Sequence, residues 1–142
     1  MNFLSKRILW AIAFAVAFAF ADTGSVIAGG DVFGDWHPYS RPVESLGVMT
    51  VSSDRLSFAT GLQARLERVR SGGGVYRVIE VQGDGFLGCG PDPANYVGFR
   101  VLDNGGLALL QYRADAPPAE PAGNDAMAVT RNGACSVMFY TR

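Results

Sequence analysis

Few side chains in this sequence could take part in chemistry. Cys89 and Cys135 are the only cysteines, and His37 is the only histidine. One histidine excludes a histidine metal cluster, and any Ser-His-Asp or Cys-His site would have to use this residue. Because His37 stands between Trp36 and Pro38 in an irregular stretch, aromatic packing or simple exposure is the preferred interpretation. An even number of cysteines in an exported chain predicts a Cys89–Cys135 disulfide rather than a nucleophile.

Aspartates beside glycine or proline form two further candidate groups, Asp31 with Asp35 and Asp84 with Asp92. Paired carboxylates can perform acid-base chemistry. However, aspartate is common at such positions because it caps turns, and no D-x-[DN]-x-[DN]-G calcium loop occurs. We therefore expect no enzyme activity, no metal and no cofactor.

The densest basic group lies in the middle of the chain and comprises Arg65, Arg68, Arg70 and Arg77. If the two segments that carry these residues pair as a hairpin, Arg65 and Arg77 stand on its outer face as a small anion-binding patch. Glu67 and Glu80 interleave with them, which favours a solvated, internally paired face.

The N-terminal segment has the features of an export signal. Lys6 and Arg7 precede an unbroken apolar run, 8–21, that ends in alanine, phenylalanine and alanine. A positive start, a short apolar core and small residues at positions −3 and −1 predict a secretory signal peptide cleaved before Asp22. The alternative, an uncleaved anchor, would need about 20 apolar residues. We expect an exported protein, periplasmic or extracellular, with no transmembrane span after cleavage.

Cleavage would leave about 121 residues, the size of one domain. The whole chain has 12 basic and 13 acidic side chains. Loss of Lys6 and Arg7 makes the mature chain more acidic, which gives no basis for nucleic-acid binding. The Gly-rich start, 22–33, predicts a flexible tail, and 34–142 predicts a single domain.

Short strands separated by turns account for most of this domain. Strands are expected near Trp36 and at 46–52, 55–60, 75–81, 96–103, 107–113, 126–131 and 135–141. Met49, Val51, Leu56 and Phe58 are expected to face inward, as are Val97, Phe99 and Val101, and Val137 and Phe139. The segments 82–95, which carries Cys89, and 114–125, which is rich in proline, are expected to be loops, the second of them mobile.

The segment Gln63–Arg70 is ambiguous. Leu62, Leu66 and Val69 fit a helical stripe, whereas Leu62, Ala64 and Leu66 alternate with polar residues. A strand is favoured because the flanking residues make poor helix caps. Eight or nine short strands without βαβ spacing predict an all-β fold, an antiparallel up-and-down β-barrel of about eight strands, with a β-sandwich as the alternative.

The tripeptide Gly34-Asp35-Trp36 at the entry to this meander resembles the G-x-W signature of lipocalins and related calycin barrels. The resemblance implies that Trp36 plugs one end of the barrel and that a late arginine, Arg131 or Arg142, packs across it. A ligand pocket of this type would be lined by Phe58, Tyr76, Phe99 and Tyr112.

A second resemblance concerns Ser71-Gly72-Gly73-Gly74-Val75-Tyr76. This run is similar to the Ser-Gly-x-x-Tyr loop that some exported bacterial lysozyme inhibitors insert into the enzyme. The alternative, favoured by the residues themselves, is a glycine hairpin loop followed by a strand tyrosine.

Three functions follow as hypotheses. The chain is expected to be a non-catalytic binding protein of the cell envelope. The alternatives are an inhibitor of an extracellular hydrolase, a lysozyme or protease, acting through 71–74 or 117–123, and a carrier of a small apolar ligand. An eight-stranded barrel of this length leaves little interior beyond what side chains fill, which favours a protein or envelope partner.

Overall fold

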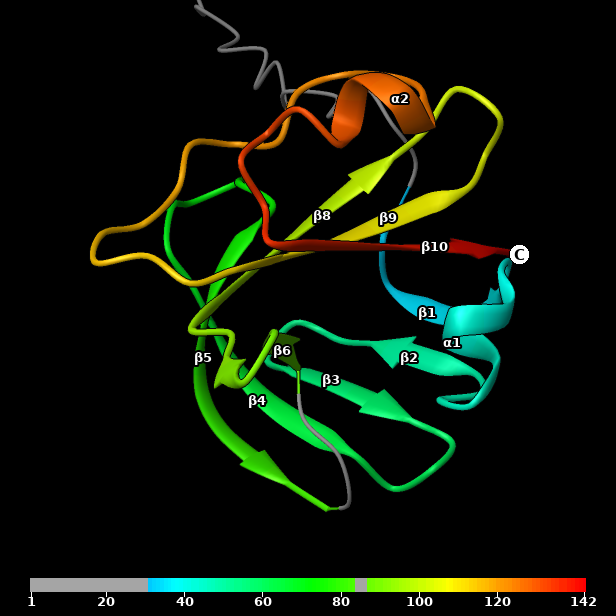
Figure 1. Cartoon of the computed structure of the whole chain (residues 1–142), viewed down its shortest axis with the longest axis horizontal. Coiled ribbons are helices and arrows are strands. Elements are labelled where there is room, and N and C mark those ends of the chain that lie inside the picture. Colours follow the sequence, from blue (N-terminus) through cyan, green and yellow to red (C-terminus); the bar gives the residue numbers. More distant parts are fainter. Residues whose placement is uncertain (1–30, 84–86) are drawn as a thin grey trace, which may run out of the picture.

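Figure 1 shows a computed structural model of the chain, which describes residues 31–83 and 87–142. Eight strands form one closed antiparallel barrel. Around the barrel every strand pairs with its neighbours in the chain, and the last strand pairs with the first, as an up-and-down meander requires. The predicted all-β barrel is confirmed. The predicted signal peptide, 1–21, lies outside the described residues.

The elements follow one another with short connections. In chain order they are β1 (Gly34–Pro38), α1 (Arg41–Glu44), β2 (Met49–Val51), β3 (Arg55–Phe58), β4 (Gln63–Arg68), β5 (Val75–Gln82), β6 (Gly88–Cys89), β7 (Asp92–Pro93), β8 (Tyr96–Val101), β9 (Leu107–Tyr112), α2 (Ala126–Val129) and β10 (Ser136–Thr141). The barrel order is β1-β10-β9-β8-β5-β4-β3-β2, and β6 and β7 form a separate two-stranded sheet.

Alternation of apolar and polar residues determines which side chains face inward. In the β2–β3 hairpin Met49 pairs with Phe58 and Val51 with Leu56, and all four are buried as predicted. The ambiguous segment is strand β4, because pairing with β3 and β5 on its two sides satisfies its backbone. The alternation of apolar and polar residues, and not the helical spacing of Leu62, Leu66 and Val69, therefore describes this segment.

Inward side chains from all eight strands, together with residues of the connecting segments, form the main core. Its buried members are Trp36, Val43, Met49, Val51, Leu56, Phe58, Leu62, Ala64, Leu66, Tyr76, Leu87, Ala94, Val97, Phe99, Leu107, Leu109 and Tyr140. Val97 and Phe99 are buried here and Val101 packs against this core, so all three face inward as predicted.

A second core lies outside the barrel, over β8, β9 and β10. Every residue of β9 is buried, because one face of the strand points inward and the other lies beneath the segment 114–135. Val137 and Phe139 belong to this outer core, so the prediction that they face inward is wrong. Met138 and Tyr140 face the interior instead. A shift of one residue exchanges the two faces of a strand, and β10 is apolar on both.

The segment 126–131 was expected to be a strand and is instead helix α2 with its flanking turn. Asp125 caps this helix, since its side chain accepts a hydrogen bond from the Ala128 amide at 2.8 Å. A strand has no place here because β10 already pairs with β9 on one side and with β1 on the other. Across the described residues no helix is long and apolar enough to cross a membrane.

Candidate functional site

Near the start of β1, at one end of the barrel, Trp36 is 1 % exposed and packs in the main core. Its indole Nε1 donates a hydrogen bond to the Val32 carbonyl at 2.9 Å. The Arg142 guanidinium lies over the ring, 4.1 Å from its centroid, and Nη2 donates to the carbonyls of Asp31 and Phe33 at 2.9 and 2.6 Å. A cation–π contact and two charged hydrogen bonds therefore join the C-terminus to the start of the domain.

Arg142, and not Arg131, occupies the position across the tryptophan. The segment 22–33 was expected to be a flexible tail, but its last three residues are attached to the domain. Val32 and Phe33 pack against the main core, and the Asp31 carbonyl accepts a hydrogen bond from Arg142. The remainder of that tail, 22–30, lies outside the described residues.

The opposite end of the barrel is covered by the β6–β7 turn. Cys89 and Cys135 form the predicted disulfide, with their Cα atoms 5.3 Å apart. Gln111, fully buried, accepts a hydrogen bond from the Gly88 amide at 2.8 Å through Oε1. Leu87, the residue before Gly88, is buried in the main core. Sequence reasoning missed Gln111, although its inward position in β9 after Leu107 and Leu109 was readable from the alternation.

The aromatic residues predicted to contact a ligand are not brought together as a set. Phe58, Tyr76 and Phe99 lie in the main core at 4, 1 and 4 % exposure. Tyr76 and Phe99 meet edge to face, and Arg68 donates two hydrogen bonds to the Tyr76 hydroxyl. A ligand chamber would leave such a lining accessible, whereas each of these three rings is at most 4 % exposed.

Tyr112, the fourth predicted ligand contact, lies in the outer core. Its hydroxyl and that of Tyr140 are buried, and within the described part of the chain neither has a hydrogen-bond partner. Burial raises the pKa of Tyr140 to about 12. Burial, assisted by the negative charge of Glu120, also raises the pKa of Tyr112.

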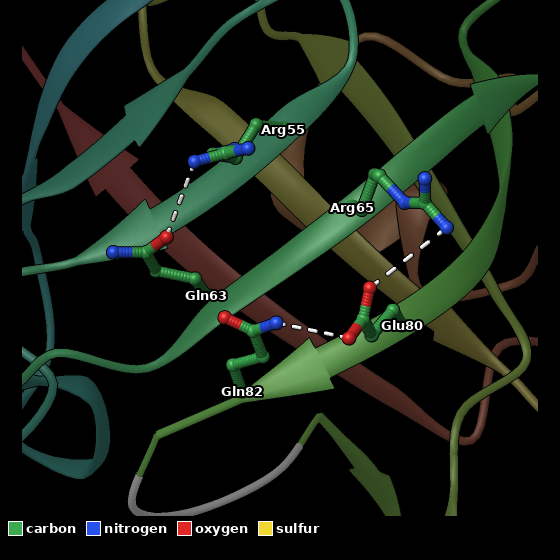
Figure 2. A pocket seen from close by; sticks show the side chains of 5 residues that line it. All are labelled: Arg55, Gln63, Arg65, Glu80 and Gln82. Atoms are coloured by element: carbon green, nitrogen blue, oxygen red, sulfur yellow. Dashed lines mark hydrogen bonds and ion pairs between the residues drawn. The ribbon is translucent and has the colours of Figure 1, made fainter.

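A shallow pocket of about 40 Å³ lies on the outer face of β3, β4 and β5. Figure 2 shows its lining side chains: Arg55, Gln63, Arg65, Glu80 and Gln82. The Arg65 Nη2 lies 3.8 Å from the Glu80 Oε2, and both side chains are about half exposed. Neighbouring Arg55 and Arg65 are paired in register, so the two guanidinium groups share this face.

Arg77, which was considered with Arg65 as part of an outer-face anion patch, does not line this pocket. Its guanidinium lies over the Tyr96 ring, 5.9 Å from the centroid, and its register partner is Glu67. The pocket therefore combines Arg65 with Arg55 and not with Arg77, and the contact of Arg65 with Glu80 agrees with the internally paired face that the sequence favoured.

Two exposed loops that are distant in the sequence are tied together by Glu120. Its Oε1 accepts a hydrogen bond from the Arg70 Nη1 at 2.8 Å, and its Oε2 accepts one from the Gly74 amide at 2.7 Å. Arg70 also donates to the Pro118 carbonyl. We call residues 70–74 and 115–120 together the paired-loop surface. Both segments that sequence reasoning offered for inhibition contribute to it.

The proline-rich segment was expected to be mobile, but it is attached to the barrel along its length. Asn95 exchanges two hydrogen bonds with the Ala114 backbone, at 2.6 and 2.9 Å. Pro121 is buried against Gly98, where an added Cβ would approach its Cγ at 3.0 Å. At Gly73 an added Cβ would meet the Glu120 carboxylate, which would have to move. Glycine at 73 and 98 lets the proline-rich segment approach the backbone closely.

The remaining candidates for chemistry lie apart from one another. His37 is exposed on β1, Asp31 accepts from the Phe33 amide at 2.9 Å, and Asp35 accepts from the Thr50 hydroxyl at 2.6 Å. Asp92 is exposed in β7, and Asp84 lies outside the described residues. In residues 31–83 and 87–142, no three histidines, cysteines or carboxylates cluster as metal ligands would.

The fold defines a small, closed, antiparallel β-barrel with a disulfide and a second core on its outer face. In three comparisons, no family model, no curated protein and no solved structure matched this chain significantly.

Proposed function

We propose that this chain is an exported, non-catalytic β-barrel that binds a partner protein of the cell envelope or its surroundings through the paired-loop surface. The observation that carries the proposal is the pair of contacts made by Glu120 to Arg70 and Gly74. These contacts fix exposed backbone before any partner arrives. Pre-organised loops lose less conformational entropy on binding, which raises affinity. The disulfide is compatible with an oxidising compartment.

The narrower candidate is inhibition of an extracellular hydrolase, a lysozyme or a protease. Ser71 and Gly72 are exposed at the tip of the β4–β5 loop, and Gly72 has a φ of 71°, in the left-handed region that favours glycine. Complexes of hydrolases with protein inhibitors typically use an inhibitor surface that hardly changes shape on binding. A loop tip anchored beneath by Glu120 fits this requirement. The carrier hypothesis has less support because Phe58, Tyr76 and Phe99 pack within the core and are at most 4 % exposed.

The proposal is tested by affinity capture with the purified oxidised protein against envelope and secreted fractions. Two matched variants accompany it: Glu120→Ala, which releases the two loops, and Glu44→Ala, which removes an exposed carboxylate on α1. We expect a stoichiometric partner that the wild type and Glu44→Ala retain and that Glu120→Ala retains poorly. If the partner is a hydrolase, its activity should fall on binding.

Two results would contradict the proposal. One is a partner that all three proteins retain equally, since the paired-loop surface would then have no part in binding. The other is a small molecule found in the protein by native mass spectrometry with no protein partner, which would favour the carrier.

A further inference from the structure

The second half of β5 has a strand neighbour on one side only. β5 pairs with β8 over Val75–Arg77, and its last bond to that side is from the Val78 amide to the Asn95 carbonyl at 3.0 Å. Residues 80–82 pair with β4 alone, and β6 pairs with β7. Within the described residues, the backbone of 79–82 therefore has no strand partner on the side that faces β8. In Figure 1 this is the lower part of β5.

A bulge shapes this free edge. The register moves between Arg65 and Leu66, so that Ile79 has no partner on β4, and pairing is regular again from Glu80 to Gln82. Val78 packs against the core and Val81 lies opposite the inward Ala64, so the two residues between them both face outward. Ile79 and Val81 are exposed by 41 and 36 %, and the stretch has no lysine or proline, the residues that commonly protect edges.

The outer face beside this edge carries excess positive charge. Arg65 reaches over β5 towards Glu80, as Figure 2 shows, and Arg55 makes one long hydrogen bond of 3.4 Å to Gln63. Glu80 is the only carboxylate among the five lining residues of the pocket. One of its oxygens already accepts from Gln82 at 2.9 Å. The hollow of about 40 Å³ has room for a carboxylate group.

We propose that residues 79–82 of β5 bind an extended acidic segment of a partner protein by strand addition, with a carboxylate of that segment on Arg65. Main-chain hydrogen bonds along an edge supply affinity, and alternate side chains supply specificity. The added strand would lie about 10 Å from β4, a span that a glutamate and an arginine side chain cover together. This surface is separate from the paired-loop surface, so the proposal does not depend on the function proposed above.

The test is a nuclear magnetic resonance titration of the ¹⁵N-labelled oxidised protein with a blocked hexapeptide that alternates valine and glutamate. We expect amide shifts at 79–82. Arg65→Gln should weaken binding about three- to fivefold, since an exposed ion pair contributes up to about 1 kcal/mol. Arg55→Gln, the same change one strand further from the edge, should weaken it less. Ile79→Asp, at an exposed position, should abolish binding through repulsion at the edge.

Several results would overturn the proposal. One is the absence of amide shifts at a peptide concentration of about 1 mM, which would detect even weak specific binding. The others are shifts confined to other parts of the barrel, and equal binding of a peptide that alternates valine and lysine. Shifts at 79–82 that depend on protein concentration without peptide would identify a second copy as the occupant, which would also overturn it.

Discussion

Replacing Arg142 by alanine is expected to destabilise the whole barrel, although the residue is exposed and C-terminal. The change removes a cation–π contact to Trp36, worth about 0.5 to 1 kcal/mol at an exposed site. It also removes hydrogen bonds to the Asp31 and Phe33 carbonyls, worth about 1 kcal/mol together once solvent exposure is considered. We therefore expect the free energy of unfolding to fall by about 2 kcal/mol.

The assay is urea unfolding of residues 22–142 with the disulfide formed. Of the two tryptophans, Trp10 lies outside this range, so the fluorescence would report Trp36 alone. Arg142→Lys should show an intermediate loss, because lysine keeps the charge without the planar guanidinium. Arg131→Ala is the matched control. If Arg142→Ala is no less stable than Arg131→Ala, the stabilising role of the Arg142 contacts is refuted.

Three further changes test the opposite end and the buried polar groups. Replacing Cys89 and Cys135 by serine should lower stability by about 3 to 4 kcal/mol in urea unfolding, because the bond closes a loop of 46 residues; an unchanged midpoint would contradict this. Gln111→Leu should cost about 1 to 3 kcal/mol and speed amide exchange at Gly88, whose donor it leaves unpaired. Tyr140→Phe should leave stability at pH 7 unchanged or raised. Because the pKa of Tyr140 is raised to about 12 from 10.0 in the unfolded chain, wild-type stability should be full below pH 10 and fall as the pH rises towards 12. The phenylalanine variant should lose less stability over that range, and equal losses would argue against this pKa.

The barrel was predictable because its hairpins alternate cleanly. Met49, Val51, Leu56 and Phe58 could face only one way without exposing four apolar side chains. The facing of β10 could not be predicted in this way, because Val137 to Tyr140 are all apolar. Their outer face is buried by the segment 114–135, which alternation within β10 does not reveal. The helix at 126–129 could not be predicted from local sequence, because it depends on β10 having strand partners on both sides, β9 and β1.

The candidate site was less predictable than the fold. Glu120 lies 50 residues from Arg70 and 46 from Gly74, and no local pattern marks so distant a contact. Two glycines indicate in the sequence where the proline-rich segment contacts the barrel. Gly98 within a strand and Gly73 within a loop are both positions where another part of the chain approaches the backbone closely.

The most direct test of the central claim is a measurement of backbone motion by ¹⁵N relaxation for residues 70–74 and 115–120, in the wild type and in Glu120→Ala. We expect order parameters of about 0.85 for both loops in the wild type and a fall to about 0.6 or below in the variant, because the Glu120 side chain holds both loops. Low order parameters in the wild type, or loops equally rigid without Glu120, would contradict a pre-organised paired-loop surface.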